Sequence, residues 1–288
     1  MRSGDEPGCT QEPAGLARAA FRDEIGEVEP IATADDVDAA ARRLFGAALG
    51  AACGVLHVTS VAREDPLQVI RVGPDAPKSA TDFFVLQLAR ARVEAILVTG
   101  SVLRAEPTLR YELAAPFTEA LRAWRRRAGL AAPPLVAVLT RDAALPADHP
   151  TWTSWARPVV LTDAPTAAAL RARLPARVQI VAHPAPSPRA ALAHLRGARG
   201  CRGISVEAGP RVAAPLYAPP VAVDELLLGV FEGPLPETAR AGALVDEPTL
   251  EGAMRRVGGP TAVREPSGVW RFSRWLSPAR RGTAAGSR

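Results

Sequence analysis

The chain has 288 residues, of which 48% are hydrophobic, so it can hold one large domain or two small ones. Its net charge of +5 comes almost entirely from arginine, and aromatic residues make up only 5%. Because no basic stretch is interleaved with aromatics, the charge does not predict a nucleic-acid partner. No apolar run is long enough to span a bilayer, and the first 30 residues contain no apolar targeting segment. We therefore expect a cytoplasmic protein with no membrane partner.

The three cysteines and four histidines do not predict a metal site. Cys9, Cys53 and Cys201 are isolated from one another, and the histidines share no metal-ligand spacing. We therefore expect neither a bound metal nor a disulfide.

The domain organisation is read from composition. Residues 1–30 are acidic and polar and predict a disordered leader, and residues 277–288 predict a flexible tail. Neither an internal repeat nor a Pro/Gly/Ser-rich linker divides the remainder, so residues 31–276 are expected to form one domain.

Apolar spacing predicts alternating strands and helices in chain order. Predicted strands span 54–62, 67–72, 94–98, 134–140, 158–162, 178–182, 203–207, 221–230, 261–264 and 269–276. Predicted helices span 33–48, which opens on a capping pattern, and 79–92, 117–129, 165–174, 188–197 and 211–217. Repeated β-α-β units followed by closing strands predict a three-layer α/β/α sandwich. Its central sheet should be mostly parallel, with antiparallel closing strands at one edge.

The junction between the predicted strand 203–207 and the helix that follows it is a candidate binding site. The strand 203–207 ends at Glu207 and is broken by Ala208-Gly209-Pro210, with Pro210 suited to the first turn of the next helix. An abrupt strand-to-helix corner leaves backbone N–H groups free, and such a corner suits an anion such as a pyrophosphate. Glu207 would face the same edge of the sheet, where open α/β folds bind ligands.

Two blocks of sequence carry a family resemblance. Glu207-Ala208-Gly209-Pro210 and the later Val223-Asp224-Glu225-Leu226 resemble an E-(G/A)-G-P…D-E-L signature. The upstream block LARARVEAILVTGSVLRAEPTL, residues 88–109, resembles a motif of the form L-R-x-x-A-D-A-I-L-V-G-x-x-T-V-x-A-(D/E)-x-P-x-L. Both belong to the riboflavin-biosynthesis reductase domain, a pyrimidine reductase of the dihydrofolate-reductase-like superfamily. The resemblance covers about residues 54–276.

The resemblance implies an NADPH-dependent reductase that acts on a small-molecule substrate. Hydride would pass to the ribosyl C1′ of a phosphoribosylamino-pyrimidine, or to a related pterin-like substrate. The resemblance assigns no catalytic residue. It also implies a homodimer formed through the closing strands around 221–231. The residues implied to contact the substrate are Arg90, Glu106, Leu109 and Glu207. Those implied to hold NADPH are Gly100, Ser101, Thr140, Arg141, Thr162, Gly209, Pro210, Arg211 and Val212.

The residues themselves leave alternatives open. Arg90 could clamp a phosphate or form a surface ion pair, and Arg141 could read the NADPH 2′-phosphate or be an ordinary loop arginine. His57 reads as a buried, hydrogen-bonded histidine. Asp224 and Glu225 could be structural.

The chain also departs from the family pattern in its substrate half. Ser60-Val61-Ala62-Arg63 replaces an S-x-D-G turn, Val102 replaces a threonine, and Glu112 stands where an arginine is expected. These losses support an alternative function. The chain could be a catalytically inactive paralogue that binds a nucleotide or a partner.

Overall fold

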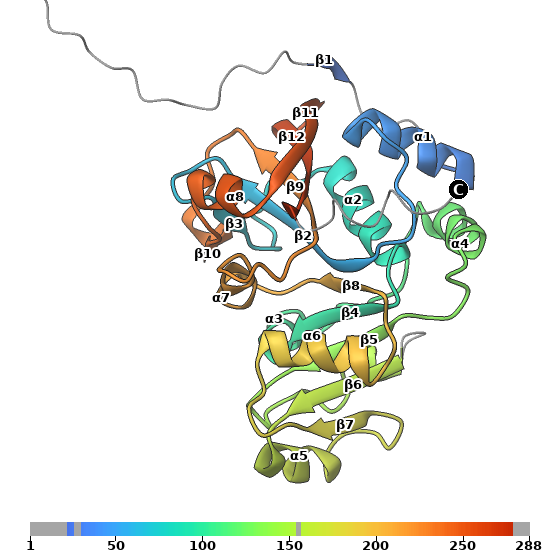
Figure 1. Ribbon diagram of the computed structural model, residues 1–288, viewed down its shortest axis with the longest axis vertical. Helices are drawn as coiled ribbons and strands as arrows, with labels where there is room; N and C mark the ends of the chain where they lie inside the picture. Colours follow the sequence, from blue (N-terminus) through green and yellow to red (C-terminus); the bar gives the residue numbers. More distant parts are fainter. Residues whose placement is uncertain (1–21, 26–29, 154–156, 279–288) are drawn as a thin grey trace, which may run out of the picture.

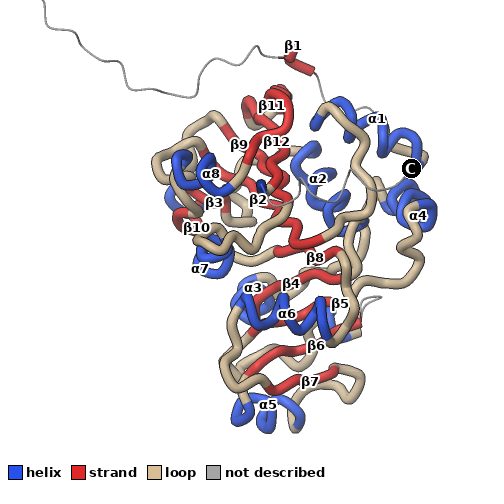
Figure 2. Tube along the Cα trace, viewed as in Figure 1, coloured by secondary structure: helices blue, strands red, loops and turns tan. Residues whose placement is uncertain are grey.

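The computed structural model describes residues 22–25, 30–153 and 157–278. Its strands form one twelve-stranded sheet in the order β1-β11-β12-β9-β2-β8-β4-β5-β6-β7, with β3 and β10 attached beside β2. The strands are β1 (Arg22–Ile25), β2 (Gly54–Ala62), β3 (Gln68–Ile70), β4 (Ala95–Thr99), β5 (Leu135–Leu139), β6 (Arg157–Thr162), β7 (Gln179–Ala182), β8 (Gly203–Val206), β9 (Glu225–Phe231), β10 (Arg240–Ala243), β11 (Arg255–Glu265) and β12 (Gly268–Leu276). The order of the strands from β11 to β7 can be followed in Figure 2.

Parallel pairing dominates the sheet. All neighbours from β9 through β2, β8, β4, β5 and β6 to β7 are parallel. Strand β12 is antiparallel to both β9 and β11, and β3 is antiparallel to β2 and β10. The predicted mostly parallel sheet with antiparallel closing strands is therefore confirmed.

Helices cover both faces of this sheet (Figure 1). Helices α1 (Ala34–Phe45), α2 (Ala80–Ala91), α4 (Thr118–Arg127) and α5 (Ala164–Arg171) contribute to one apolar core. Helices α6 (Pro188–Gly197), α7 (Pro210–Ala213) and α8 (Glu247–Ala253) contribute to the other. Successive strand residues alternate between the two cores, as Leu56 and Val55 do on β2, because side chains alternate across a strand. The three-layer α/β/α sandwich is confirmed.

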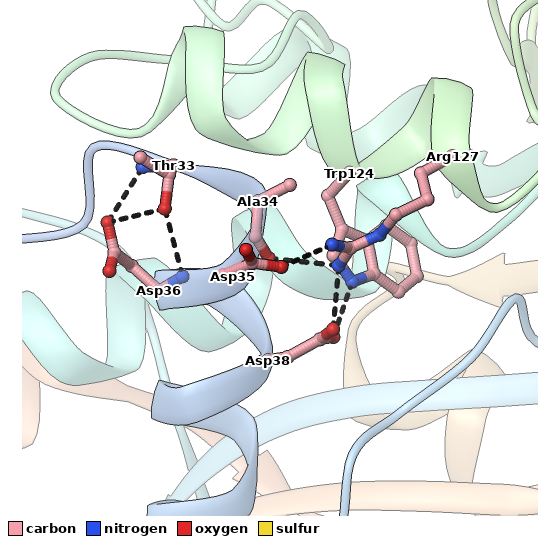
Figure 3. Close-up of polar contacts among 7 residues, drawn as sticks. All are labelled: Thr33, Ala34, Asp35, Asp36, Asp38, Trp124 and Arg127. Atoms are coloured by element: carbon pink, nitrogen blue, oxygen red, sulfur yellow. Dashed lines mark hydrogen bonds and ion pairs between the residues drawn. The ribbon is translucent and has the colours of Figure 1, made fainter.

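Helix α1 is fixed at its start and along its side. Thr33 and Asp36 form the predicted capping box. Figure 3 shows the contact with α4, where Trp124 Nε1 donates to Asp38 Oδ1 at 2.8 Å. Arg127 bridges Asp35 and Asp38 at 2.6 Å each. Together these bonds hold α1 beside α4.

Several elements were not predicted from sequence. They are α3 (Gly100–Ala105), β10, α8, and the 3-10 helices η1 (Pro150–Trp152) and η3 (Glu237–Ala239). The 3-10 helix η2 (Ala214–Leu216) falls within the helix predicted over 211–217. Strand β10 has the sequence RAGA, with Gly242 at φ +119, and carries no apolar alternation. Strand β1 lies within the stretch predicted as a disordered leader. The rest of that leader and most of the predicted tail lie outside the described residues.

In the part of the chain that the structure describes, no helix combines the length and hydrophobicity needed to cross a membrane. Nor do three His, Cys, Asp or Glu side chains of the described residues converge as a metal site would require.

Candidate functional site at the carboxyl edge of the sheet

The carboxyl ends of four neighbouring parallel strands bring most of the predicted site residues to one edge. Strand β8 ends just before Glu207, β4 just before Gly100, β5 just before Thr140, and β6 at Thr162. These residues are far apart in sequence. Parallel pairing places them in a row, at the edge where open α/β sheets bind ligands.

Two of the predicted substrate residues contact each other. Arg90 Nε donates to both carboxylate oxygens of Glu207 at 3.0 Å, and Arg90 Nη2 donates to Oε2 at 2.6 Å. Arg90 Nη1 donates to the carbonyl oxygen of Arg110 at 3.3 Å. The side chains are only 5% and 9% exposed. Burial opposes the charge of Arg90, and the Glu207 carboxylate outweighs it, so the pKa of Arg90 is raised.

Tyr111 and Glu106 complete this group. The Arg90 guanidinium lies over the Tyr111 ring, 5.0 Å from its centroid. The Tyr111 hydroxyl is buried and has no hydrogen-bond partner in the described structure. Burial raises the pKa of Glu106, and the nearby Arg90 opposes that rise. Tyr111 was missed from the sequence, because it lies in an irregular segment after the matched motif.

The predicted strand-to-helix corner is present and open to solvent. Gly209 is the N-cap of α7, with Pro210 at the first helical position. Gly209 and Arg211 are exposed, and a Cβ on Gly209 would meet no atom within 4 Å. Pro210, also predicted to hold NADPH, is buried, so its ring does not face solvent. The helix is shorter than predicted. One α-turn is followed by η2, where Pro215 lacks the N–H that a longer α-helix would need.

His57 on β2 contacts Tyr217, the residue that follows this corner. Its Nδ1 is 2.7 Å from the Tyr217 hydroxyl, which follows η2, and both residues are buried. Burial lowers the pKa of His57 to about 4, so the ring is neutral at physiological pH. The prediction of a buried, hydrogen-bonded histidine is confirmed. The pair ties the end of the corner to β2.

Solved structures share this arrangement of elements, although neither a family model nor a curated protein matches the sequence. A pyrimidine reductase-like protein from Corynebacterium diphtheriae superimposes with a TM-score of 0.56 at 19% identity, covering 78% of this chain and 92% of that chain. The chain has the fold of the riboflavin-biosynthesis pyrimidine reductases.

Two further structures with this pyrimidine reductase fold agree. The Saccharomyces riboflavin biosynthesis reductase Rib7 gives a TM-score of 0.50 at 13% identity, covering 82% of this chain and 96% of that one. Acinetobacter baumannii RibD gives 0.55 at 13% identity, covering 78% of this chain. The match spans only 58% of the RibD chain.

Within the pyrimidine reductase fold, some predicted cofactor residues do not face solvent. A Cβ on Gly100 would lie 2.8 Å from Thr140 Oγ1, so this glycine permits packing onto Thr140 rather than the close approach of a ligand. The Thr140 hydroxyl is bonded to the backbone of Asp142. Thr162 is fully buried, out of reach of a ligand at the surface.

The remaining predicted residues stay accessible to different degrees. Ser101 and Arg141 are exposed, while Val212, Glu106 and Leu109 are half-buried. Ser101 Oγ is 2.8 Å from Thr99 Oγ1, so its hydroxyl is partly engaged within the same turn.

Asp224 and Glu225 lie at the opposite edge of the sheet, at the amino end of β9. Glu225 accepts hydrogen bonds from Arg92 at 2.9 Å and from Arg274 at 2.7 Å, and is 1% exposed. Asp224 accepts from the N–H of Val55 at 2.6 Å and from Arg196 at 2.7 Å. Asp224 and Glu225 therefore both have structural roles, which is one of the alternatives that the sequence left open.

A cavity of about 420 Å³ also opens at that opposite edge. Arg125, Arg157 and Arg199 are among its lining residues. Arg125 donates to the carbonyl oxygens of Arg90, Ala91 and Val93 at the end of α2. Because helix carboxyl ends carry partial negative charge, this arginine stabilises the helix end.

Proposed function

We propose that the chain is an NADPH-dependent reductase of the riboflavin-pathway pyrimidine reductase type. Its substrate would be a phosphoribosylamino-pyrimidine or a related pterin-like compound. The observation that carries the proposal is the strand-to-helix corner with exposed Gly209 and Arg211, which follows directly after the buried Arg90–Glu207 pair at the end of β8. The shared fold supports the reductase class.

The corner suits the diphosphate of a dinucleotide. Gly209 has open space where a side chain would be, and Pro210 places the next N–H, that of Arg211, on the first turn. Helix α7 has only four residues, so its dipole adds little, and backbone N–H groups with exposed Arg211 and Arg141 supply the attraction. Bound NADPH would supply a hydride to the substrate's C1′.

Arg90 takes a different role from the one the resemblance implies. Its Nε, Nη1 and Nη2 already have protein partners, so it orients Glu207 instead of clamping a substrate phosphate. The Glu207 carboxylate keeps lone pairs that could accept hydrogen bonds from a pyrimidine. Glu207 is therefore the substrate contact and Arg90 the residue that positions it.

One observation favours the alternative of an inactive paralogue. Arg90 and Glu207 form a buried, hydrogen-bonded ion pair with each other, and such a pair also fits a purely structural site. On that function the chain would bind a nucleotide or a partner without turnover.

A homodimer remains a prediction. Strand β9 lies between β12 and β2 and all seven of its residues are buried within one chain. Its apolar side chains therefore supply the core of the monomer, and a dimer would need a different surface.

Titration with NADPH separates the functions, because quenching of the five tryptophans reports binding independently of turnover. The proposal expects saturable binding, and consumption of NADPH when a phosphoribosylamino-pyrimidine is added. Binding without consumption by any pyrimidine or pterin favours the inactive paralogue, and no binding rejects both cofactor assignments.

Two charge reversals test where the phosphates lie. Arg211→Glu should weaken NADPH binding at least tenfold, whereas Arg126→Glu on the exposed side of α4 should leave it unchanged. Arg141→Glu should weaken NADPH more than NADH if Arg141 contacts the 2′-phosphate. Equal losses for the two cofactors would reject that role.

A further inference from the structure

A second polar group lies at the same edge of the sheet, outside the residues described above. Ser60 Oγ on β2 donates to Asp82 Oδ1 in the first turn of α2, and both residues are half-buried. His57 on β2 is paired with Val206, the last residue of β8. Ser60 therefore lies three residues, or about 10 Å, beyond the end of β8. The Asp82 carboxyl, which is bonded to Ser60, therefore lies at the carboxyl end of β2, beyond the level of Glu207 on β8.

Among the residues that the structure describes, no cation forms an ion pair with Asp82. In the described part of the chain, its side chain accepts a hydrogen bond only from Ser60, whereas Glu207 and Glu225 are each paired with arginine. Lys78 is the only lysine of the chain, and its ammonium group donates to the carbonyl oxygen of Gly73. The Asp82 carboxyl is therefore not held in its charged form by an ion pair.

The backbone N–H groups of Ala80 and Thr81, at the amino end of α2, are bonded to another carboxylate rather than to Asp82. Glu265 of β11 accepts from the backbone N–H groups of Ala80 and Thr81, at 2.9 Å each, and from the Ser79 hydroxyl at 2.8 Å. A second carboxylate thus occupies the helix end. Burial, together with the negative charge of Glu265, raises the pKa of Asp82 to about 6, and the Ser60 hydrogen bond partly offsets the rise.

The neighbouring strands are shaped around this carboxyl. A Cβ on Gly229, the residue of β9 level with Ser60, would come within 3.1 Å of Asp82 Oδ1. It would also come within 3.2 Å of Phe272 on β12 and 3.5 Å of Ser60 Oγ. Strand β9 therefore faces the carboxyl with a glycine, Phe272 of β12 packs beside that glycine, and Glu265 of β11 is the charged neighbour of Asp82.

We propose that Asp82 is a catalytic residue of this reductase, the acid that delivers a proton to the substrate as it is reduced. The proposal rests on the proposed function and deepens it. It stands on the placement of a half-buried carboxyl, bonded to Ser60 and without an ion-pair partner among the described residues, at the carboxyl edge of the sheet, one strand away from Glu207. A general acid must hold its proton near the working pH, and the environment of Asp82 does this.

The proton is required by the balance of the reaction. The bond between C1′ and the ring oxygen O4′ breaks, and its electron pair stays on O4′. C1′ receives the hydride that the nicotinamide cofactor supplies and forms the new C–H bond. O4′ takes the proton from the Asp82 carboxyl, which leaves a ribityl hydroxyl and an Asp82 carboxylate. Solvent returns the proton to Asp82 before the next turnover.

Two variants of the full chain test the proposal against pH. Asp82→Asn keeps the size of the side chain and removes the proton, so kcat with a phosphoribosylamino-pyrimidine should fall at least 100-fold while NADPH affinity is unchanged. Ser60→Ala removes a hydrogen bond that lowers the Asp82 pKa, so the fall of kcat above about pH 6 should move to higher pH. Glu119→Gln, an exposed carboxylate on α4, is the matched control and should change neither.

Carbon-13 NMR titration of the aspartate carboxyls supplies a readout that does not need turnover. It should show a carboxyl titrating near pH 6 that is missing from Asp82→Asn. A pKa near 4 for Asp82, or an Asp82→Asn variant with kcat within threefold of wild type, overturns this proposal and leaves the proposed function standing. A wild-type chain that binds NADPH but reduces no pyrimidine or pterin overturns the proposed function and, with it, the role of Asp82.

Discussion

Arg90 on α2 donates hydrogen bonds to both carboxylate oxygens of Glu207, a residue 117 positions away at the end of β8. Both side chains are nearly excluded from solvent. From the sequence, Arg90 was expected either to bind a phosphate or to form an ion pair at the surface. In the structure Arg90 forms a buried ion pair with Glu207, and this pair fixes the carboxylate at the edge of the sheet.

Breaking this pair from one side should destabilise the chain strongly. Glu207→Gln leaves the buried Arg90 charge without its counterion, so the free energy of unfolding should fall by about 3–5 kcal/mol in urea titrations. Combining it with Arg90→Met removes the stranded charge and should recover part of the loss. Glu119→Gln breaks the exposed pair with Arg122 and should cost less than about 1 kcal/mol. Equal, small effects at both pairs would contradict the buried geometry.

Asp82 and His57 should affect stability in opposite directions between about pH 4 and pH 6. The pKa of Asp82 is raised from 3.8 to about 6, so its contribution to the free energy of unfolding is full below pH 3.8 and is lost as the pH rises to 6. The pKa of His57 is lowered from 6.5 to about 4, so its contribution is full above pH 6.5 and is lost as the pH falls to 4.

Urea unfolding across this range can separate the two residues. In Asp82→Asn only the His57 effect should remain, so the stability of the variant should rise with pH more steeply than that of wild type. Parallel pH profiles for the two proteins would show that Asp82 does not hold its proton more tightly in the folded state.

The contact between α1 and α4 gives a prediction about stability alone. Asp38→Ala removes the acceptor of the buried Trp124 Nε1 and a partner of Arg127, so it should cost about 1–3 kcal/mol. Asp35→Ala removes only an exposed partner of Arg127 and should cost no more than about 0.5 kcal/mol. Hydrogen exchange should show α1 opening more often in the first variant. If both variants behave alike, the Trp124 bond does not hold α1.

The sequence predicted the sheet well because its strands carry strong local signals. Strand β2 was predicted with its observed ends, Gly54 and Ala62, since a continuous β-branched and apolar run is bounded by a glycine and a charged turn. Helix α3 was missed because it has only six residues and begins at Gly100, which breaks a helical pattern.

The site could be predicted only in part, because its chemistry depends on contacts between distant segments. Motif residues such as Glu207 and Gly209 were placed correctly at the carboxyl edge by the parallel-sheet rule. The pairing of Arg90 with Glu207, and of Ser60 with Asp82, joins residues on separate elements. Burial of Thr162 likewise follows from packing, which no local pattern around that residue reports.

On the proposed function, the corner after β8 with exposed Gly209 and Arg211 holds a reduced nicotinamide dinucleotide. Backbone hydrogen exchange of the full chain, measured with and without saturating NADPH, would locate the bound cofactor. We expect the N–H groups of Ala208, Gly209 and Arg211 to exchange at least tenfold more slowly when NADPH is present, because the cofactor phosphates would accept their hydrogen bonds. Unchanged exchange at these amides, with NADPH bound elsewhere on the chain or not at all, would contradict the account.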